Sequence, residues 1–136
     1  MTKYQIIKEE INVLPSSSIF YEKIKESCEE GIIKHVHFIT FDTDKFMYIN
    51  DDFGFDVGDK VIFTNYAFIR DSFSDILNKN QHNLLTRLGG DEFSLFIVNE
   101  NSDLIKTKTQ EALDHISQYD YSQVGCMRPV TASAGI

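Results

Sequence analysis

Residues 84–98 read LLTRLGGDEFSLFIV, in which a glycine pair separates two runs of residues that favour strands. Consecutive glycines readily adopt the positive φ angles of a tight hairpin turn. We therefore predict strands over 84–88 and 93–98, joined at the glycines. This hairpin places two consecutive carboxylates, Asp91 and Glu92, at its tip.

Outward from the hairpin, apolar residues recur in some segments at strand spacing and in others at helix spacing. The segment 16–31 begins with serines that suit a helix N-cap and ends at Gly31, which suits a C-cap. The alternation predicts an α/β domain in which helices pack on a central sheet, and it leaves the strand order open. The predicted helices are 16–31, 59–77 and 104–116, and the other predicted strands are 35–41 and 130–136.

Length and composition predict a single domain without a membrane span. The 136 residues are 42% hydrophobic and 25% charged, as in ordinary soluble domains. We expect one domain over 1–136, with 1–15 as a lead-in segment, and no membrane contact, because no apolar run approaches ~18 residues. The N-terminus lacks a secretory pattern, and two cysteines, Cys28 and Cys126, are too few for a disulfide scaffold. A reducing, cytoplasmic location is therefore expected.

The charge balance bears on the partners. A net charge of −8 and a pI near 4.8 disfavour nucleic acid, whose binding depends on dense Lys and Arg. An acidic domain that handles a small polyphosphate needs metal cations to screen the charge. We therefore expect no nucleic-acid partner, and chemistry assisted by metal ions.

Two aspartates follow the predicted strand 35–41, in the run Asp42-Thr43-Asp44. Carboxylates two positions apart in an extended chain point to the same side. Their like charges repel unless a cation or solvent separates them. An isolated pair of this kind is most often a solvated turn, but as a site it suits Mg²⁺, which prefers carboxylate and carbonyl oxygens.

A polar stretch, NDDFG at 50–54, precedes Gly58 and Asp59 at the start of the predicted long helix. Turn chemistry and a helix cap explain this stretch without any ligand. Asn50 and Asp59 also match the Watson–Crick edge of guanine, because a carboxylate accepts from its N–H groups and an amide both donates and accepts. Both interpretations stay open from these residues alone.

Three segments taken together resemble a known family. They are FDTDKFMYINDDFGFDVGD at 41–59, RLGGDEF at 87–93 and VTASAGI at 130–136. In this order and spacing they are similar to the motifs of GGDEF domains, the catalytic-type domains of bacterial diguanylate cyclases. The resemblance runs from about Leu14 to Ile136.

This resemblance implies a palm-like α+β fold with a central, mostly antiparallel five-stranded sheet flanked by helices. It also implies that the chain stops before the C-terminal helix of the family. Two Mg²⁺ or Mn²⁺ ions per site would be held by Asp42, Asp91 and the backbone carbonyl of Thr43. Glu92 would support the active site.

The resemblance also implies a substrate and a reaction. Asn50 and Asp59 would read guanine, and main-chain amides near Lys45 and Phe46 would meet the β and γ phosphates of GTP. Two GTP-loaded domains would face one another as a homodimer, assembled by a segment outside this chain, and condense two GTP into cyclic di-GMP and pyrophosphate. Close approach of the backbone to substrate is expected at two glycines, Gly89 and Gly90.

Several positions depart from the family motifs. Met47 stands where the family has a phosphate-binding Lys, and Phe55 replaces a His. Residues 80–83, NQHN, replace an inhibitory R-x-x-D, so product inhibition at that site is not expected. These departures keep a second function open, a degenerate GGDEF domain that senses GTP or contacts another protein without catalysis.

Two unrelated interpretations of Asp42-Thr43-Asp44 fit less well. A phosphatase of the haloacid-dehalogenase type would use the first Asp as nucleophile, but it has Gly and then Thr or Val where this chain has Lys45 and Phe46. A calcium-binding EF-hand needs a Gly where its loop turns sharply, and none follows here.

Overall fold

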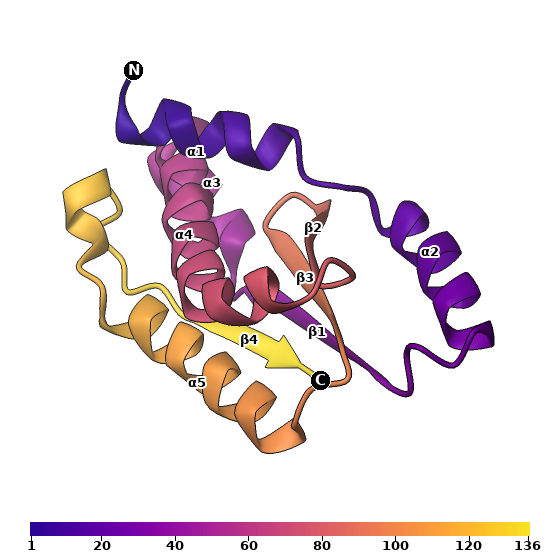
Figure 1. Cartoon of the computed structure of the whole chain (residues 1–136). Coiled ribbons are helices and arrows are strands. Elements are labelled where there is room, and N and C mark those ends of the chain that lie inside the picture. Colours follow the sequence, from indigo (N-terminus) through magenta and orange to yellow (C-terminus); the bar gives the residue numbers. More distant parts are fainter.

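The computed structural model of the chain describes the backbone of residues 1–136 and every side chain except those of Ser17 and Lys23. Helices surround a four-stranded sheet (Figure 1). Among the described residues, no helix is both long enough and apolar enough to cross a membrane. The strands are β1 (Val36–Thr43), β2 (Leu84–Gly89), β3 (Glu92–Val98) and β4 (Ala132–Gly135). The helices are α1 (Lys3–Asn12), α2 (Ser17–Glu29), α3 (Phe46–Phe53), α4 (Phe55–Lys79) and α5 (Ser102–Gln118), with a 3-10 turn, η1 (Tyr121–Val124).

The strands form one antiparallel sheet in the order β2-β3-β1-β4. Side chains alternate across it, so Leu95 and Ile97 face the main core with α4 and α5, while Phe96 lies on the opposite face. There α2 covers the sheet and places Phe20 against Phe96, with ring centroids 3.9 Å apart (Figure 1). The predicted α+β class, a sheet flanked by helices, is confirmed.

The sheet has four strands, so the count of five implied by the resemblance is wrong for this chain. The connection 119–131, between α5 and β4, does not extend as a strand. The Asp120 carboxylate accepts from the Ser122 N–H at 3.1 Å and starts the tight turn η1. Gly125 then reverses the chain at φ 92°, and Pro129 has no N–H for a strand ladder.

The polar turn predicted at 50–54 is wrong, because these residues up to Phe53 belong to α3. Phe46, Ile49 and Phe53 recur at helical spacing and pack toward the core. Gly54 alone makes the break between the helices, at φ 89°. The helix α4 therefore begins one turn earlier than predicted.

The helices predicted over 16–31 and 104–116 are confirmed as α2 and α5. Ser16 occupies the N-cap position of α2 but makes no capping hydrogen bond with its side chain. Gly31 follows the cap residue Glu30 and adopts φ 77°, the left-handed conformation common just after helices.

The segment 1–15, expected only as a lead-in, contains α1. Thr2 begins this helix with a capping box. Glu10 then fastens α1 to α4, because the Tyr66 hydroxyl donates to its Oε1 at 2.5 Å and Arg70 pairs with its Oε2 at 2.8 Å. The first helix is thus part of the packed domain.

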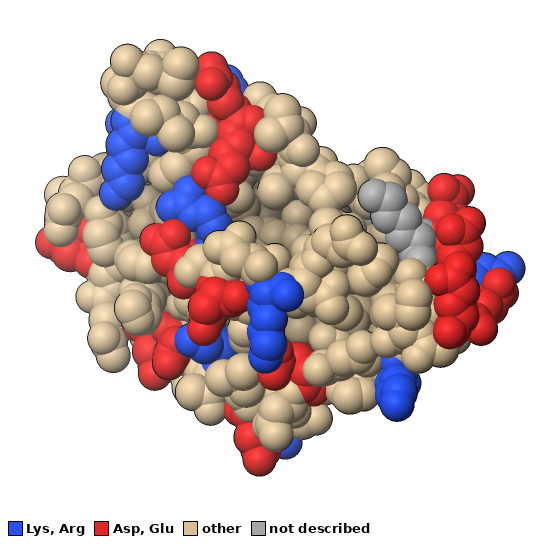
Figure 2. All heavy atoms as spheres, in the orientation of Figure 1, with Lys and Arg blue, Asp and Glu red and all other residues tan. Residues whose placement is uncertain are grey.

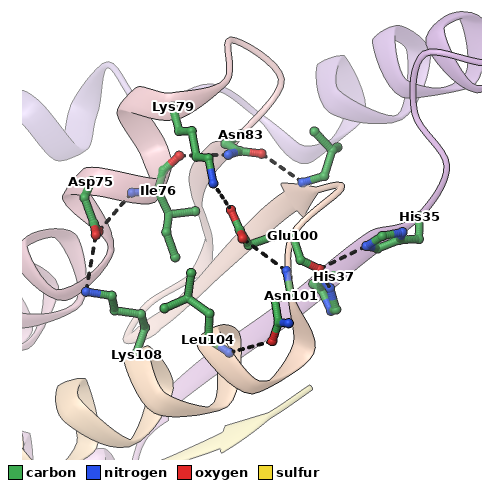
Figure 3. Close-up of polar contacts among 11 residues, drawn as sticks. His35, His37, Asp75, Ile76, Lys79, Asn83, Glu100, Asn101, Leu104 and Lys108 are labelled. Atoms are coloured by element: carbon green, nitrogen blue, oxygen red, sulfur yellow. Dashed lines mark hydrogen bonds and ion pairs between the residues drawn. The ribbon is translucent and has the colours of Figure 1, made fainter.

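Asn83 connects the end of α4 to the end of β3 (Figure 3). It is 6% exposed; its Nδ2 donates to the Ile76 carbonyl and its Oδ1 accepts from the Val98 N–H, both at 2.8 Å. We expect Asn83→Ala to lower the free energy of unfolding by roughly 2–3 kcal/mol, because it leaves both buried backbone groups unpaired. Urea unfolding measures this loss.

The matched control is Asn80→Ala in the same turn. The Asn80 Oδ1 accepts from the His82 N–H at 2.9 Å, where solvent can replace it. This variant is expected to cost about 1 kcal/mol or less. Equal losses in the two variants would contradict the structural role given to Asn83.

Candidate active site

The tip of β1 and the tip of the β2–β3 hairpin meet at one edge of the sheet. Asp42 lies directly opposite Glu92 in the antiparallel register, so both side chains belong to the same face. Asp91 precedes β3 and reaches toward β1, where its Oδ2 accepts from the Thr43 N–H at 3.1 Å. The fold therefore brings together four residues that the sequence singled out, although 48 positions separate Thr43 from Asp91.

Asp42 and Asp91 form a carboxylate pair. A hydrogen bond between the two carboxyl groups, followed by partial burial and the charges of Asp91 and Asp44, raises the pKa of Asp42 to about 6. Carboxylates this close repel each other unless a proton or a cation lies between them. The pair therefore fits a divalent cation.

The oxygen atoms at this site suit Mg²⁺ or Mn²⁺ rather than an ion whose ligands must all come from the protein. Across the described side chains, no three His, Cys, Asp or Glu residues are grouped so that they could hold a metal by themselves. Mg²⁺ commonly takes one or two carboxylates and completes its shell with water and substrate phosphates. Asp42, Asp91 and the neighbouring carbonyl of Thr43 match that requirement.

Thr43 is held in place by two buried side chains that no sequence motif marks. Its Oγ1 accepts from Asn65 Nδ2 at 2.9 Å, and Asn65 Oδ1 accepts from the Tyr121 hydroxyl. Asn65 and Tyr121 are each 2% exposed. An Asn within an amphipathic helix resembles a surface residue in sequence, so only the packing reveals that α4 and η1 position the end of β1.

Asp44 does not join the carboxylate pair. Its two carboxylate oxygens accept from the Thr131 hydroxyl at 2.8 Å and the Ser133 hydroxyl at 2.6 Å. Its N–H donates to the Thr131 carbonyl at 2.9 Å. The two aspartates therefore have different roles, since Asp42 meets the hairpin while Asp44 ties β1 to β4.

Asn50 and Asp59, the residues expected to read guanine, come from two helices that contact each other. The Asn50 Oδ1 is buried and has no hydrogen-bond partner among the described residues. It lies against Gly58, where an added Cβ would be only 1.8 Å away. Asp59 follows Gly58 and is exposed. An unpaired buried acceptor costs free energy, so a ligand that offers donors here would recover it.

Asp44 and Lys45 form the tight turn from β1 into α3, and Phe46 is the first residue of that helix. Lys45 adopts φ 55°, which is uncommon for a residue with a side chain, and it makes no side-chain cap on α3. The first N–H groups of α3 therefore lack a side-chain acceptor at the N-cap. Met47, next along, is 70% exposed.

Gly89 and Gly90 lie exposed at the hairpin bend. A Cβ at either position would meet nothing within 4 Å, so packing does not explain the small residues. Arg87 closes the bend, because its Nε and one terminal nitrogen donate to the Gly90 carbonyl at 2.9 and 2.5 Å. The bend thus presents backbone that a ligand could approach.

The family model of the diguanylate cyclase GGDEF domain matches residues 10–136. The biofilm architecture maintenance protein MbaA of Vibrio cholerae is 30% identical over 106 residues, which is 76% of this chain. The chain spans only 13% of the length of MbaA.

Solved structures share the fold. The active GGEEF domain of a diguanylate cyclase from Vibrio cholerae superposes with a TM-score of 0.68 at 22% identity, over 87% of this chain and 69% of that one. The coiled coil and GGDEF domain of DgcB from Caulobacter crescentus, in complex with c-di-GMP, superposes with a TM-score of 0.67 at 19% identity, over 96% and 72%. Because the family match covers nearly the whole chain and the architecture agrees, the chain belongs to the diguanylate cyclase GGDEF domain family.

Proposed function

We propose that this domain condenses two GTP molecules into cyclic di-GMP and two pyrophosphates, with two Mg²⁺ or Mn²⁺ ions per site. The observation that carries the proposal is the meeting of Asp42 and Asp91 at the sheet edge beside the uncapped turn into α3. Each 3′-oxygen forms a bond to the α-phosphorus of the other nucleotide and gives up its proton, and the bond to pyrophosphate breaks. The atoms balance without any further reactant.

Asp42, Asp91 and the Thr43 carbonyl would hold the ions. When bound, the ions would favour loss of the proton from the attacking hydroxyl and offset the charge of the leaving pyrophosphate. Glu92 would support the site from the same face of the sheet, opposite Asp42. Asn65 would keep the Thr43 segment in place through its hydrogen bond to the Thr43 hydroxyl.

The substrate would lie between the helix pair and the sheet edge. Asn50 and Asp59 would read the guanine edge, with the unpaired Asn50 oxygen as the first contact. The main-chain amides of Lys45 and Phe46 would bind the β and γ phosphates. Gly89 and Gly90 would let the hairpin backbone come close to the nucleotide.

A second copy of the domain is the proposed partner, because the cyclic product joins two nucleotides and each site would hold one. A segment outside this chain would assemble the homodimer. DgcB, a relative in fold, is seen in complex with c-di-GMP. The proposed location is the cytoplasm, where thiols such as the free Cys28 and Cys126 stay reduced.

We propose no role for nucleic acid or for membrane contact by this domain. On the face shown in Figure 2, Lys and Arg form separate small patches, while Asp and Glu gather where α2 lies. Binding to a long phosphate backbone needs dense positive charge, and the net charge here is −8.

Incubation of the protein with GTP and Mg²⁺, followed by mass spectrometry, tests the proposal. We expect cyclic di-GMP and two pyrophosphates per product molecule. Absence of product at saturating GTP would overturn the cyclase function.

One observation favours the alternative of a GTP-binding module without catalysis, namely that the exposed Met47 carries no charge for a triphosphate. Calorimetric titration separates the two functions, because the module binds GTP and releases no pyrophosphate. Loss of all GTP binding would exclude both.

A further inference from the structure

A pocket of about 960 Å³ opens at the turn that follows β1. Asp44 and Lys45, which line it, follow immediately after Asp42 and Thr43 in the chain. Ser133 also lines it; its backbone pairs with Asp42 across the sheet, and its hydroxyl donates to Asp44 at 2.6 Å. The pocket is therefore adjacent to Asp42, both along the chain and across the sheet.

Two of the residues that line the pocket are basic, although the protein as a whole is acidic. They are Lys45, from the turn between β1 and α3, and Arg128, from the segment that precedes β4. The carboxylate of Asp44, also in the lining, accepts hydrogen bonds from two hydroxyls and contributes one negative charge. The charged residues of the lining therefore sum to one positive charge, on a chain whose net charge is −8.

Arg128 is held there by a weak partner. Its terminal nitrogen pairs with Asp52 Oδ2 at 2.6 Å, and its guanidinium lies 5.9 Å from the centre of the Tyr48 ring. The two charged side chains are 39% and 46% exposed, and exposed ion pairs contribute little to stability. A guanidinium can donate two parallel hydrogen bonds to the oxygens of one phosphate, which is a stronger interaction than an exposed ion pair. A phosphate can therefore displace Asp52 from Arg128.

We infer that Arg128 binds the terminal phosphates of the nucleotide in this pocket, exchanging its contact with Asp52 for them. This inference rests on the proposed function and names a binding residue outside the three motifs that suggested it. The guanidinium of Arg128 would supply the positive charge that the uncharged Met47 does not provide in this region, where Arg128 already contacts Tyr48 and Asp52 of α3. Arg128 is thus a substrate-binding residue, and Asp52 a competitor that keeps it in place when the pocket is free.

Calorimetric titration with guanosine 5′-[α,β-methylene]triphosphate and Mg²⁺ tests the inference, because the carbon bridge prevents turnover. Arg128→Gln is expected to weaken binding of this triphosphate about tenfold, equivalent to ~1.4 kcal/mol. GMP, which has no terminal phosphates, is expected to bind the variant within about twofold of the unmodified protein. Arg128→Lys keeps the positive charge but cannot form paired hydrogen bonds to a phosphate. Its affinity for the triphosphate is expected to lie between those of the unmodified protein and Arg128→Gln.

Asp52→Asn is the matched control, because it breaks the same ion pair and leaves Arg128 free. We expect it to bind the triphosphate as tightly as the unmodified protein or up to about threefold more tightly. A purely structural ion pair predicts instead that Asp52→Asn and Arg128→Gln weaken binding alike. Thermal unfolding of both variants shows whether either has lost its fold.

The outcomes separate this inference from the proposed function. If the unmodified protein fails to bind the triphosphate, both are overturned. If it binds and Arg128→Gln binds equally well, the role of Arg128 is overturned while the proposed function stands. Equal weakening by the two variants also overturns the inference, since it assigns the effect to the ion pair itself.

Discussion

Replacing Asp42 by Asn is expected to slow cyclic di-GMP formation by at least about a hundredfold, equivalent to ~2.7 kcal/mol of transition-state stabilisation. The change removes one negative oxygen from the carboxylate pair and leaves the side chain's shape. Asp42 is exposed at the sheet edge, so the fold should tolerate it. Product formation at saturating GTP and Mg²⁺, followed by mass spectrometry, measures the loss.

Asp44→Asn is the matched variant that distinguishes the roles of Asp42 and Asp44 at the end of β1. The Asp44 carboxylate is bonded to the Thr131 and Ser133 hydroxyls and does not join the pair. We expect Asp44→Asn to form cyclic di-GMP at least about tenfold faster than Asp42→Asn does. The reverse order would show that the metal ions depend on Asp44 rather than on the Asp42–Asp91 pair.

A second measurement on Asp42→Asn needs no turnover. A ligand that binds only the folded state raises the midpoint of thermal unfolding. Mg²⁺ is therefore expected to raise the midpoint of the unmodified protein and to have a smaller effect on Asp42→Asn. Equal shifts would place the cation elsewhere on the molecule.

Gly58→Ala is expected to weaken GTP binding on the order of a hundredfold, about 3 kcal/mol, with little loss of stability. The new Cβ would lie 1.8 Å from Asn50 Oδ1, so the Asn50 side chain must rotate away from its present place. The backbone can stay, because Ala favours a helix by about 1 kcal/mol over Gly and offsets much of the crowding. Calorimetry with the methylene-bridged GTP analogue measures the affinity.

Asn50→Ala provides the matched control for this effect. If Gly58 matters through Asn50, the two single variants lose similar affinity and the double variant loses no more than either. Additive losses would mean that position 58 contacts the nucleotide by a different route. An unchanged affinity in Gly58→Ala would overturn the role given to Asn50.

The local elements could be read from the chain because each depends on neighbours in sequence. The hairpin at 84–98 follows from strand formers around two glycines, and α5 follows from apolar residues at helical spacing. The error at α3 has the same origin. Polar side chains at 50–52 conceal an apolar face made by Phe46, Ile49 and Phe53, which becomes visible only when α4 packs against it.

The two residues of the carboxylate pair could be named from the motifs, but their proximity in space could not be predicted from the sequence. Asp42 and Asp91 approach each other because β1 pairs with β3 in one particular register, and strand pairing over such a separation is set by packing of the whole core. The same holds for Thr43, whose hydroxyl is positioned by Asn65 from α4.

Sequence alone was enough for the family, the fold class and the chemical types of the site residues, since motifs and periodicity are local properties. Only the tertiary structure decided the number of strands, the contact of Gly58 with Asn50 and the place of Arg128 beside the sheet edge. The sheet and the place of Arg128 join segments that are distant along the chain, and the contact of Gly58 with Asn50 depends on how two successive helices pack. The free energy of these features comes from burial and hydrogen bonds that exist only after the core has formed.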